Sequence, residues 1–386
     1  MKRDNFIKKI TPKNVCLFFI LFLIPGCGEQ KIDQTTIRND IEFITKTITE
    51  NHPGPHNTLD PKFMTQLAMA HQEALKNAAT VTTMREYNTL IKTYMDRFHD
   101  GHLRFGPKNP TEKRTAQKTS HAISLKNFAQ NSVWITIPTF DPDCEQQKQF
   151  NNLISQLPSL RHKDTIIFDV RGNGGGNSAW AQYIVAGLFG EHFVEEKIRQ
   201  EEQKVFVEWR ASKENTDYQC SVTKKNSKEF GEKSDAALGG ESICKGMQKS
   251  LQQKETFFRQ YAQQKDQQDL PNQEDQCSAK ILVLIDKACF SATLDFIDDL
   301  KALGHSLILI GETTGADTLY MDARVVELPS GLGRIQFPMK VYRNRPRGNN
   351  EPYHPDIEYP GDMTDKPALE KWLIQNVIPQ KITSKK

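Results

Sequence analysis

The chain has 386 residues, with 51 Lys and Arg against 48 Asp and Glu and a hydrophobic fraction of 37%. Five of the basic residues and one acidic residue lie in the first 26 positions, so the remainder carries a net charge near −1. With no basic stripe outside this leader, we do not expect nucleic acid as a partner. The remaining chain exceeds the usual size of one domain, so we expect one large unit with inserted segments.

The N-terminus has the pattern of an export signal. Basic residues precede an unbroken apolar run at 15–24. This run is too short to span a bilayer, where a helix needs about 20 residues. We therefore predict that residues 1–26 are removed.

A small residue and then Cys27 follow the apolar run, an order similar to the bacterial lipobox, whose cysteine is lipidated. Pro25 is unusual inside a lipobox, and the alternative is an ordinary signal peptide in which Cys27 is incidental. By the same resemblance, Gly28 implies sorting to the outer membrane of a Gram-negative bacterium. The protein would then face the periplasm, attached to the membrane through its N-terminal lipid.

The exported part carries five further cysteines in a compartment that permits disulfides. They are Cys144, Cys220, Cys244, Cys277 and Cys289. Cys220 and Cys244 flank one polar stretch and are the pair we expect to be bonded. No Cys-x-x-Cys or His-Glu-x-x-His string is present, so we expect no metal site.

Residues 33–98 have helical periodicity. Isoleucines recur every three to four positions at Ile37, Ile41, Ile44 and Ile48. Thr83 and Glu86 form a predicted capping box. The string 52–55, His-Pro-Gly-Pro, interrupts the region, as prolines and glycine do.

From about residue 119, short apolar runs alternate with helical patterns. The runs lie at 133–137, 165–170, 281–285 and 307–310. Continuous apolar strands separated by helices favour an α/β core whose sheet is covered on both faces. A glycine-containing turn between 325–328 and 335–342 predicts a hairpin.

The segment 191–277 is rich in Gln, Lys and Glu and interrupts the alternation of strands and helices. We interpret it as an insertion. The Phe-Val-Glu-Trp string at 206–209 and a helical pattern around 251–261 favour a packed cover over the core. The alternative is a solvent-exposed polar segment without a functional role.

Ser291 follows the strand 281–285 and begins a helical pattern that ends at Gly304. At such a turn its hydroxyl lies beside backbone N–H groups and the positive end of a helix, which suits an attacking alkoxide and a developing oxyanion. Serine is equally a favoured helix cap. This motif alone is compatible with both roles.

A glycine-rich loop at 169–177 follows another strand and precedes a predicted helix at 179–189. Its bare N–H groups could hold a phosphate, or a substrate oxyanion together with the Ala292 N–H. It could also be a simple tight turn. The spacing matches neither the dinucleotide fingerprint nor the P-loop.

Asp100-Gly101-His102 closes the helical region. Histidine is the side chain best suited to general-base catalysis near neutral pH. A lone histidine is also commonly structural.

Together these segments resemble the tail-specific and carboxyl-terminal-processing serine peptidases, a superfamily that includes the tricorn protease core and the vertebrate retinoid-binding repeats. The matching strings are ITENHPGPH, DGHLRF, IIFDVRGNGGGNS, VLIDKACFSATLDFIDDLKALG, LIGETTGA and PYHPDIEY. The resemblance implies a crotonase/ClpP-like α/β core with a mixed sheet and flanking helices, preceded by a helical N-terminal domain. It also implies hydrolysis of a peptide or protein substrate, with no cofactor.

The expected organisation has six parts. They are a signal peptide at 1–26, a lipid-anchored tether at 27–32, a helical domain at 33–118, a peptidase core at 119–190 and 278–366, the insertion at 191–277, and a C-terminal helix and tail at 367–386. Residues 103–133 give 31 positions, too few for the PDZ domain that tail-specific members carry there, since a domain needs about 50. Substrate choice would then fall to the cleft and the insertion.

The superfamily has two catalytic arrangements. Tail-specific members place a lysine soon after a G-E-x-T-x-G string, but Ala316 and Asp317 follow 311–315 here and that lysine is missing. The tricorn-like branch uses the histidine of a D-G-H string. The resemblance therefore implies Ser291 as nucleophile and His102 as base. As oxyanion donors it implies the N–H groups of Gly174 or Gly175 and of Ala292.

That branch orients its histidine with a glutamate shortly before a P-D-I string, which implies Glu351 ahead of 355–357. The spacing is looser than in the family, and Asp100 or Glu358 are alternatives. An orienting carboxylate fixes the imidazole tautomer and stabilises the imidazolium. Two other classes remain as alternatives, a catalytically silent protein that binds a hydrophobic ligand or peptide on this scaffold, and a phosphate-binding enzyme.

Overall fold

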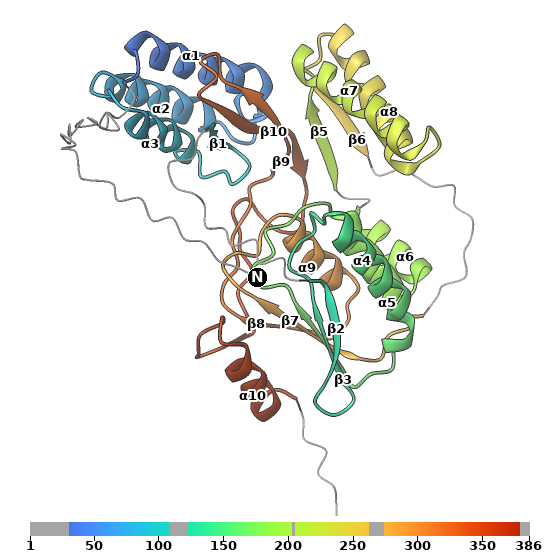
Figure 1. Ribbon diagram of the computed structural model, residues 1–386. Helices are drawn as coiled ribbons and strands as arrows, with labels where there is room; N and C mark the ends of the chain where they lie inside the picture. Colours follow the sequence, from blue (N-terminus) through green and yellow to red (C-terminus); the bar gives the residue numbers. More distant parts are fainter. Residues whose placement is uncertain (1–30, 109–121, 203–204, 262–273, 379–386) are drawn as a thin grey trace, which may run out of the picture.

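The computed structural model describes residues 31–108, 122–202, 205–261 and 274–378. The predicted signal peptide, Cys27 and most of the tether lie outside these residues. The described chain forms a helical N-terminal layer, an antiparallel sheet and an α/β core (Figure 1). No helix in the described ranges is long and apolar enough to cross a membrane.

The N-terminal layer is helical, as predicted, and contains three α-helices. They are α1 (Gln34–Asn51), α2 (Phe63–Ala78) and α3 (Met84–Asp96). The four isoleucines of α1 are fully buried, and the capping box of Thr83 and Glu86 is present at the start of α3. The interruption at 52–55 is also confirmed, because α1 ends before a short 3-10 turn, η1 (Gly54–His56).

The larger sheet has six strands in the order β11-β8-β7-β4-β3-β2. Their bounds are β2 Ser124–Phe128, β3 Ser132–Thr136, β4 Thr165–Asp169, β7 Lys280–Ile285, β8 Leu307–Gly311 and β11 Ile357–Glu358. All neighbours are parallel except β2, which runs antiparallel to β3 at one edge. The four predicted apolar runs are the adjacent strands β3, β4, β7 and β8, and the fold class is the predicted mixed α/β arrangement.

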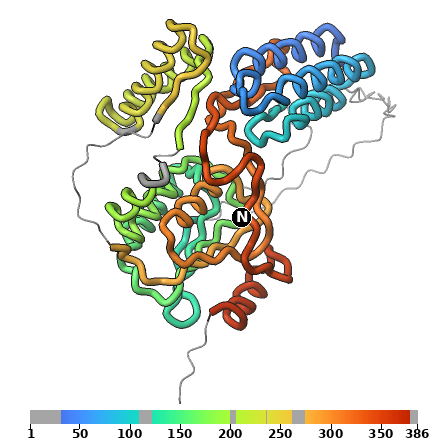
Figure 2. The backbone as a smooth tube through the Cα atoms, turned by 180° about the vertical axis from the view of Figure 1, so that it is seen from behind, coloured from blue at the N-terminus to red at the C-terminus, as the bar shows by residue number. Residues whose placement is uncertain are grey.

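Helices cover both faces of this sheet (Figures 1 and 2). One face packs against α4 (Cys144–Gln156), α5 (Ala179–Phe189), α6 (Glu191–Glu202) and α9 (Ala292–Ala302). A second short 3-10 helix, η2 (Leu157–Leu160), follows α4. The other face packs against α10 (Lys366–Asn376). A hydrophobic core lies on each face of the sheet, and successive β4 residues alternate between them, with Phe168 in one core and Ile167 in the other. Burial on both faces explains why this strand is mostly apolar.

The second sheet is antiparallel, with β9 and β10 forming its hairpin. Its strands are β1 (Arg104–Pro107), β5 (Phe206–Arg210), β6 (Phe257–Tyr261), β9 (Tyr320–Glu327) and β10 (Gly333–Arg343). The hairpin was predicted, but within the α/β core. The structure packs it on the N-terminal helices instead, because Ile335, Phe337 and Val341 share one core with α1, α2 and α3.

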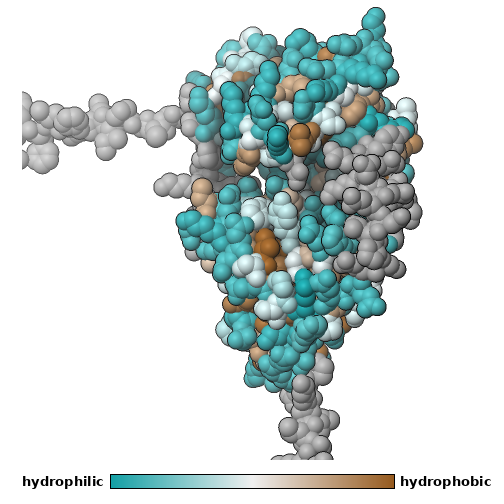
Figure 3. Space-filling model, turned by 90° about the vertical axis from the view of Figure 1, so that its right-hand side faces the viewer, coloured by the Kyte–Doolittle hydropathy of each residue, from teal (hydrophilic) through white to brown (hydrophobic). Residues whose placement is uncertain are grey.

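The 191–277 segment contributes α6 to the core and strands β5 and β6 to the second sheet. Between these strands lie α7 (Lys213–Phe230) and α8 (Asp235–Gln252), joined by a disulfide between Cys220 and Cys244, as predicted. The helical pattern around 251–261 was wrong, since 257–261 is strand β6, paired with β5. The surface seen in Figure 3 is largely hydrophilic, with apolar side chains in small groups.

Candidate active site

Ser291 lies at the turn between β7 and α9, with a backbone φ of 55° and ψ of −122°. A non-glycine residue in such a conformation is strained and persists only where surrounding contacts hold it. Here Phe290 N and Thr293 Oγ1 both donate to Asn173 O, which ties the turn to the glycine-rich loop. The Ser291 side chain forms no cap on α9. Its Oγ instead lies 3.3 Å from His102 Nε2.

His102 reaches this position from a turn that follows α3. The Asp100 side chain accepts a hydrogen bond from His102 N at 2.8 Å, which fixes the turn. A Cβ atom on Gly101 would lie 2.4 Å from the Phe290 ring, so only glycine allows the turn to pack against the residue before the nucleophile. The His102 ring also contacts Phe290, with centroids 5.1 Å apart. The D-G-H turn and the serine turn are therefore packed directly on each other.

Burial lowers the pKa of His102, and this effect outweighs the opposing influence of Asp100, Asp317 and Asp322. Arg104 lowers the pKa further. The imidazole is therefore neutral near pH 7 and can accept a proton. The separation of 3.3 Å between His102 Nε2 and Ser291 Oγ is at the long end of hydrogen-bond distances.

Of the three predicted oxyanion donors, Gly174 and Gly175 lie in the glycine-rich loop and Ala292 directly follows Ser291. Gly175 N donates to Asn173 Oδ1 at 2.9 Å, so its N–H is occupied. The N–H groups of Gly174 and Ala292 have no hydrogen-bond acceptor among the described residues. Gly175 is needed for another reason, because its φ is 95° and a Cβ there would lie 2.7 Å from Phe290 O and 2.8 Å from Ser291 Cβ.

The three candidate orienting carboxylates lie in different surroundings. Glu351 is exposed and accepts a hydrogen bond from Gly348 N at 2.6 Å. Glu358 is exposed on β11. Asp100 is buried, and its Oδ1 lies 3.8 Å from His102 Nδ1. Of the three, only Asp100 has a described contact with His102.

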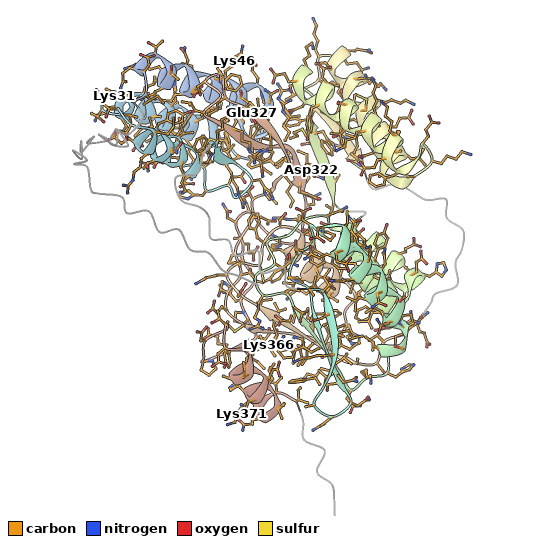
Figure 4. All side chains as sticks on the ribbon, in the orientation of Figure 1. Lys31, Lys46, Asp322, Glu327, Lys366 and Lys371 are labelled. Carbon is orange, nitrogen blue, oxygen red and sulfur yellow. A yellow bond between two sulfur atoms is a disulfide. The ribbon has the colours of Figure 1, made fainter. Side chains whose placement is uncertain are left out.

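A cavity of about 580 Å³ opens beside Ser291 and His102. Its other lining residues are Asp141, Gly176, Asn177, Ser178, Asp295, Met321, Asp322, Ala323, Lys340 and Tyr342. The last five come from the β9–β10 hairpin, so the cavity lies where the second sheet meets the α/β core. Figure 4 shows Asp322 at this junction.

Gly176, Asp322 and Lys340 were not predicted as site residues. Gly176 has a φ of 141°, and its Cβ would lie 2.1 Å from the Phe140 backbone, so the third glycine of the run could have indicated a close backbone approach. Asp322 also has a positive φ, 53°, within β9. Lys340 Nζ pairs with Asp322 Oδ2 at 2.6 Å. No short motif indicates that this hairpin reaches the serine.

An ionic cluster centred on the buried Arg347 contacts the first two turns of α9. Arg347 pairs with Asp295, Asp298 and Asp317, and Arg345 pairs with Asp317 at 3.2 Å. Burial, together with Asp298, raises the pKa of Asp295 to about 6. Among the described residues, no group of three or more His, Cys, Asp or Glu side chains is arranged to hold a metal ion.

An α/β core with a helical N-terminal layer, and a serine facing a buried histidine at a strand-to-helix turn, is an arrangement known from peptidases. The family model described as Peptidase family S41 matches residues 131–359, more than half of the chain. The protein therefore belongs to peptidase family S41, which confirms the predicted superfamily.

The chain also matches solved structures. Mature CPAF is 9% identical, with 84% of this chain and 92% of that chain covered and a TM-score of 0.55. The tricorn protease is 10% identical over 84% of this chain and 34% of its own, with a TM-score of 0.45. A lipoprotein from Streptococcus agalactiae is 12% identical over 87% and 96%, with a TM-score of 0.45. No curated protein matches by sequence.

Proposed function

We propose that this chain is a serine endopeptidase in which Ser291 forms the acyl-enzyme and His102 is the general base. The observation that carries the proposal is the 3.3 Å approach of His102 Nε2 to Ser291 Oγ at a strained turn. The serine hydroxyl faces the base and does not cap the helix that it precedes.

In the proposed reaction, neutral His102 takes the Ser291 proton as the alkoxide attacks a peptide carbonyl. The N–H groups of Gly174 and Ala292 would stabilise the oxyanion, since both are without an acceptor in the described chain. The imidazolium then protonates the leaving amine. Water, deprotonated by the same histidine, hydrolyses the acyl-enzyme.

Asp100 is the carboxylate that we propose as the orienter of His102, in place of Glu351. Its burial and its 3.8 Å separation from His102 Nδ1 support this role. A carboxylate there favours the tautomer with the proton on Nδ1, which leaves Nε2 free to accept from serine.

A lysine base has no support in this cavity. Lys340 is the one lysine among its described lining residues. Burial alone would lower the pKa of Lys340, but Asp322 and Tyr342 outweigh burial and raise it. The ammonium group therefore stays protonated and cannot remove a proton from Ser291.

The proposal includes export and attachment to the membrane through a lipid on Cys27. The motif at 24–27 supports it. The substrates would then be peptides or proteins of the periplasm. The polar lining of the cavity agrees with an extended peptide as the bound molecule.

Cleavage of an unstructured protein such as casein tests this function. The wild-type chain is expected to release internal fragments that are detected by mass spectrometry, whereas Ser291→Ala and His102→Ala variants should release none. Fragments from the Ser291→Ala variant, or none from a folded wild type given several unstructured proteins, would contradict the proposal.

A further inference from the structure

Three polar atoms, one of them on His102 itself, are buried and form no hydrogen bond with any residue that the structure describes. They are His52 Nε2, Asp100 Oδ2 and His102 Nδ1. These atoms belong to one row, since His52 Nε2 lies 3.6 Å from Asp100 Oδ2 and His102 Nδ1 lies 3.8 Å from Asp100 Oδ1. An unpaired polar atom in a protein interior is costly, so three together need an explanation.

The protonated nitrogen of His52 can be assigned from its contacts. Its Nδ1 accepts a hydrogen bond from Gly54 N at 2.9 Å and therefore carries no proton. The ring hydrogen is then on Nε2, which faces Asp100. The ring is completely buried and held between Phe63 and Tyr320, at centroid distances of 4.8 Å and 4.9 Å.

Asp100 lies between the two histidines with one oxygen toward each. Its Oδ1 accepts from His102 N at 2.8 Å, which fixes the carboxylate at that side. Its Oδ2 has only His52 Nε2 within reach among the described residues. A movement of roughly 1 Å at either histidine would give normal hydrogen-bond lengths.

We propose that His52 is a positioning residue for the catalytic histidine. Its Nε2–H donates to Asp100 Oδ2, which holds Oδ1 toward the Nδ1–H of His102 and so directs His102 Nε2 at Ser291. The row then runs Ser291, His102, Asp100, His52. This inference rests on the proposed function, in which Ser291 and His102 react. In this role His52 transfers no proton.

A purely structural role of His52 would depend on its Nδ1 and not on its Nε2. His52 follows the last residue of α1, and its Nδ1 closes the turn onto Gly54. The two roles can be separated by substitution. An asparagine places its amide near the position of Nδ1 and keeps the Gly54 contact. A glutamine reaches the position of Nε2 and keeps a donor for Asp100.

The test is the rate at which a fluorophosphonate labels Ser291 in the purified full chain, with the thermal unfolding midpoint measured beside it. We expect His52→Asn to slow labelling about tenfold and His52→Gln to restore most of that rate. His52→Phe, which keeps the ring but has no donor, should be as slow as His52→Asn. If His52→Asn does not fold, the comparison of His52→Phe with His52→Gln decides.

His305 provides a matched control, because it pairs with Asp275 at 2.8 Å in the α/β core, away from the cavity. His305→Gln should label at the wild-type rate. Equal rates for the glutamine, asparagine and phenylalanine variants of His52, or a faster asparagine variant, would overturn the inference while wild-type labelling still supports the proposed function. A wild type that is not labelled at all would instead contradict the proposed function.

Discussion

At the scale of single residues, Ser291 has a strained backbone that is held by neighbouring residues and not by a helix cap of its own side chain. The positive φ is held by Asn173 O, which accepts from Phe290 N and Thr293 Oγ1. The serine hydroxyl is then left to the imidazole of His102. Strain at this position is offset by hydrogen bonds of neighbouring residues, a distribution typical of functional turns.

Asp100 and Glu351 can be compared directly as orienters of His102. We expect Asp100→Asn to slow fluorophosphonate labelling of Ser291 about 100-fold, because an amide does not stabilise the imidazolium. Glu351→Gln should change the rate by less than about twofold, since Glu351 is exposed and bound to Gly348 N. If Glu351→Gln slowed labelling more than Asp100→Asn, Glu351 would be the carboxylate that orients His102.

The pH dependence of labelling reports the state of His102. Burial lowers its pKa below the ordinary value of 6.5, so the base is already deprotonated at neutral pH. The rate should therefore be constant from about pH 8 to about pH 7 and fall below a midpoint under the ordinary histidine value. In Asp100→Asn that midpoint should move lower still, because Asp100 raises the pKa of His102. A midpoint above the ordinary value would contradict this assignment.

Ser291 and His102 could be proposed from the sequence because each lies in a short motif: Ser291 follows a strand and begins a helix, and His102 ends an Asp-Gly-His string. The carboxylate was harder to choose. Asp100 and His52 are 48 positions apart in the chain, and their proximity depends on how α1 and α3 end. Asp322 and Lys340 could not be placed at the cavity, because this depends on the packing of the hairpin on the helical layer.

At the scale of elements, the glycine-rich loop and the start of α9 act as one unit. Gly175 lies against residues 290–292, and a Cβ atom on it would be closer to three of their atoms than packing allows.

Periodicity predicted α1, the capped start of α3, the four central strands and the β9–β10 hairpin. It missed α7 and α8, whose faces are mostly polar, and it assigned a helix where β6 pairs with β5.

Gly175→Ala tests the close packing of the loop on the serine turn. The substitution requires a positive φ for alanine and a contact of 2.7 Å with Phe290 O, so the turn must shift. We expect at least a tenfold slower labelling of Ser291, about the loss that a small misplacement of a catalytic group causes. Circular dichroism and thermal unfolding should show that the fold is kept.

Gly239→Ala on α8 is the matched control, because its Cβ would meet nothing within 4 Å. Its labelling rate should equal that of the wild type, and its stability should be unchanged or slightly higher, since alanine is favoured over glycine in helices. A Gly175→Ala variant as reactive as Gly239→Ala would show that the loop is not packed on the nucleophile in this way.

At the scale of the whole molecule, the proposed active site draws its residues from all three parts of the fold, whose arrangement is seen in Figures 1 and 2. Ser291 comes from the α/β core, whereas His102 follows the helical layer and Lys340 belongs to the second sheet. The site is complete only when these parts are packed together. The insertion supplies two strands to the same sheet. It lines no described part of the cavity, but its strand β5 pairs with β10 at Lys340 and Tyr342 and so supports the strand that does.

The proposed membrane attachment concerns the chain as a whole and depends on Cys27. A Cys27→Ser variant expressed in a Gram-negative host should move from the membrane fraction to the soluble fraction and lose labelling by a palmitate analogue. Its Ser291 labelling rate should be unchanged. Membrane association equal to that of the wild type would contradict the lipid-anchor prediction and favour an ordinary signal peptide.

The central claim is that His102 activates Ser291 as a nucleophile. The most direct measurement is peptide mapping of the purified chain after reaction with a fluorophosphonate, with the labelling rate followed in parallel. We predict one adduct, on Ser291, and a rate that falls at least about 100-fold in His102→Ala. An unlabelled wild type, an adduct on another residue, or an undiminished rate in His102→Ala would contradict the claim.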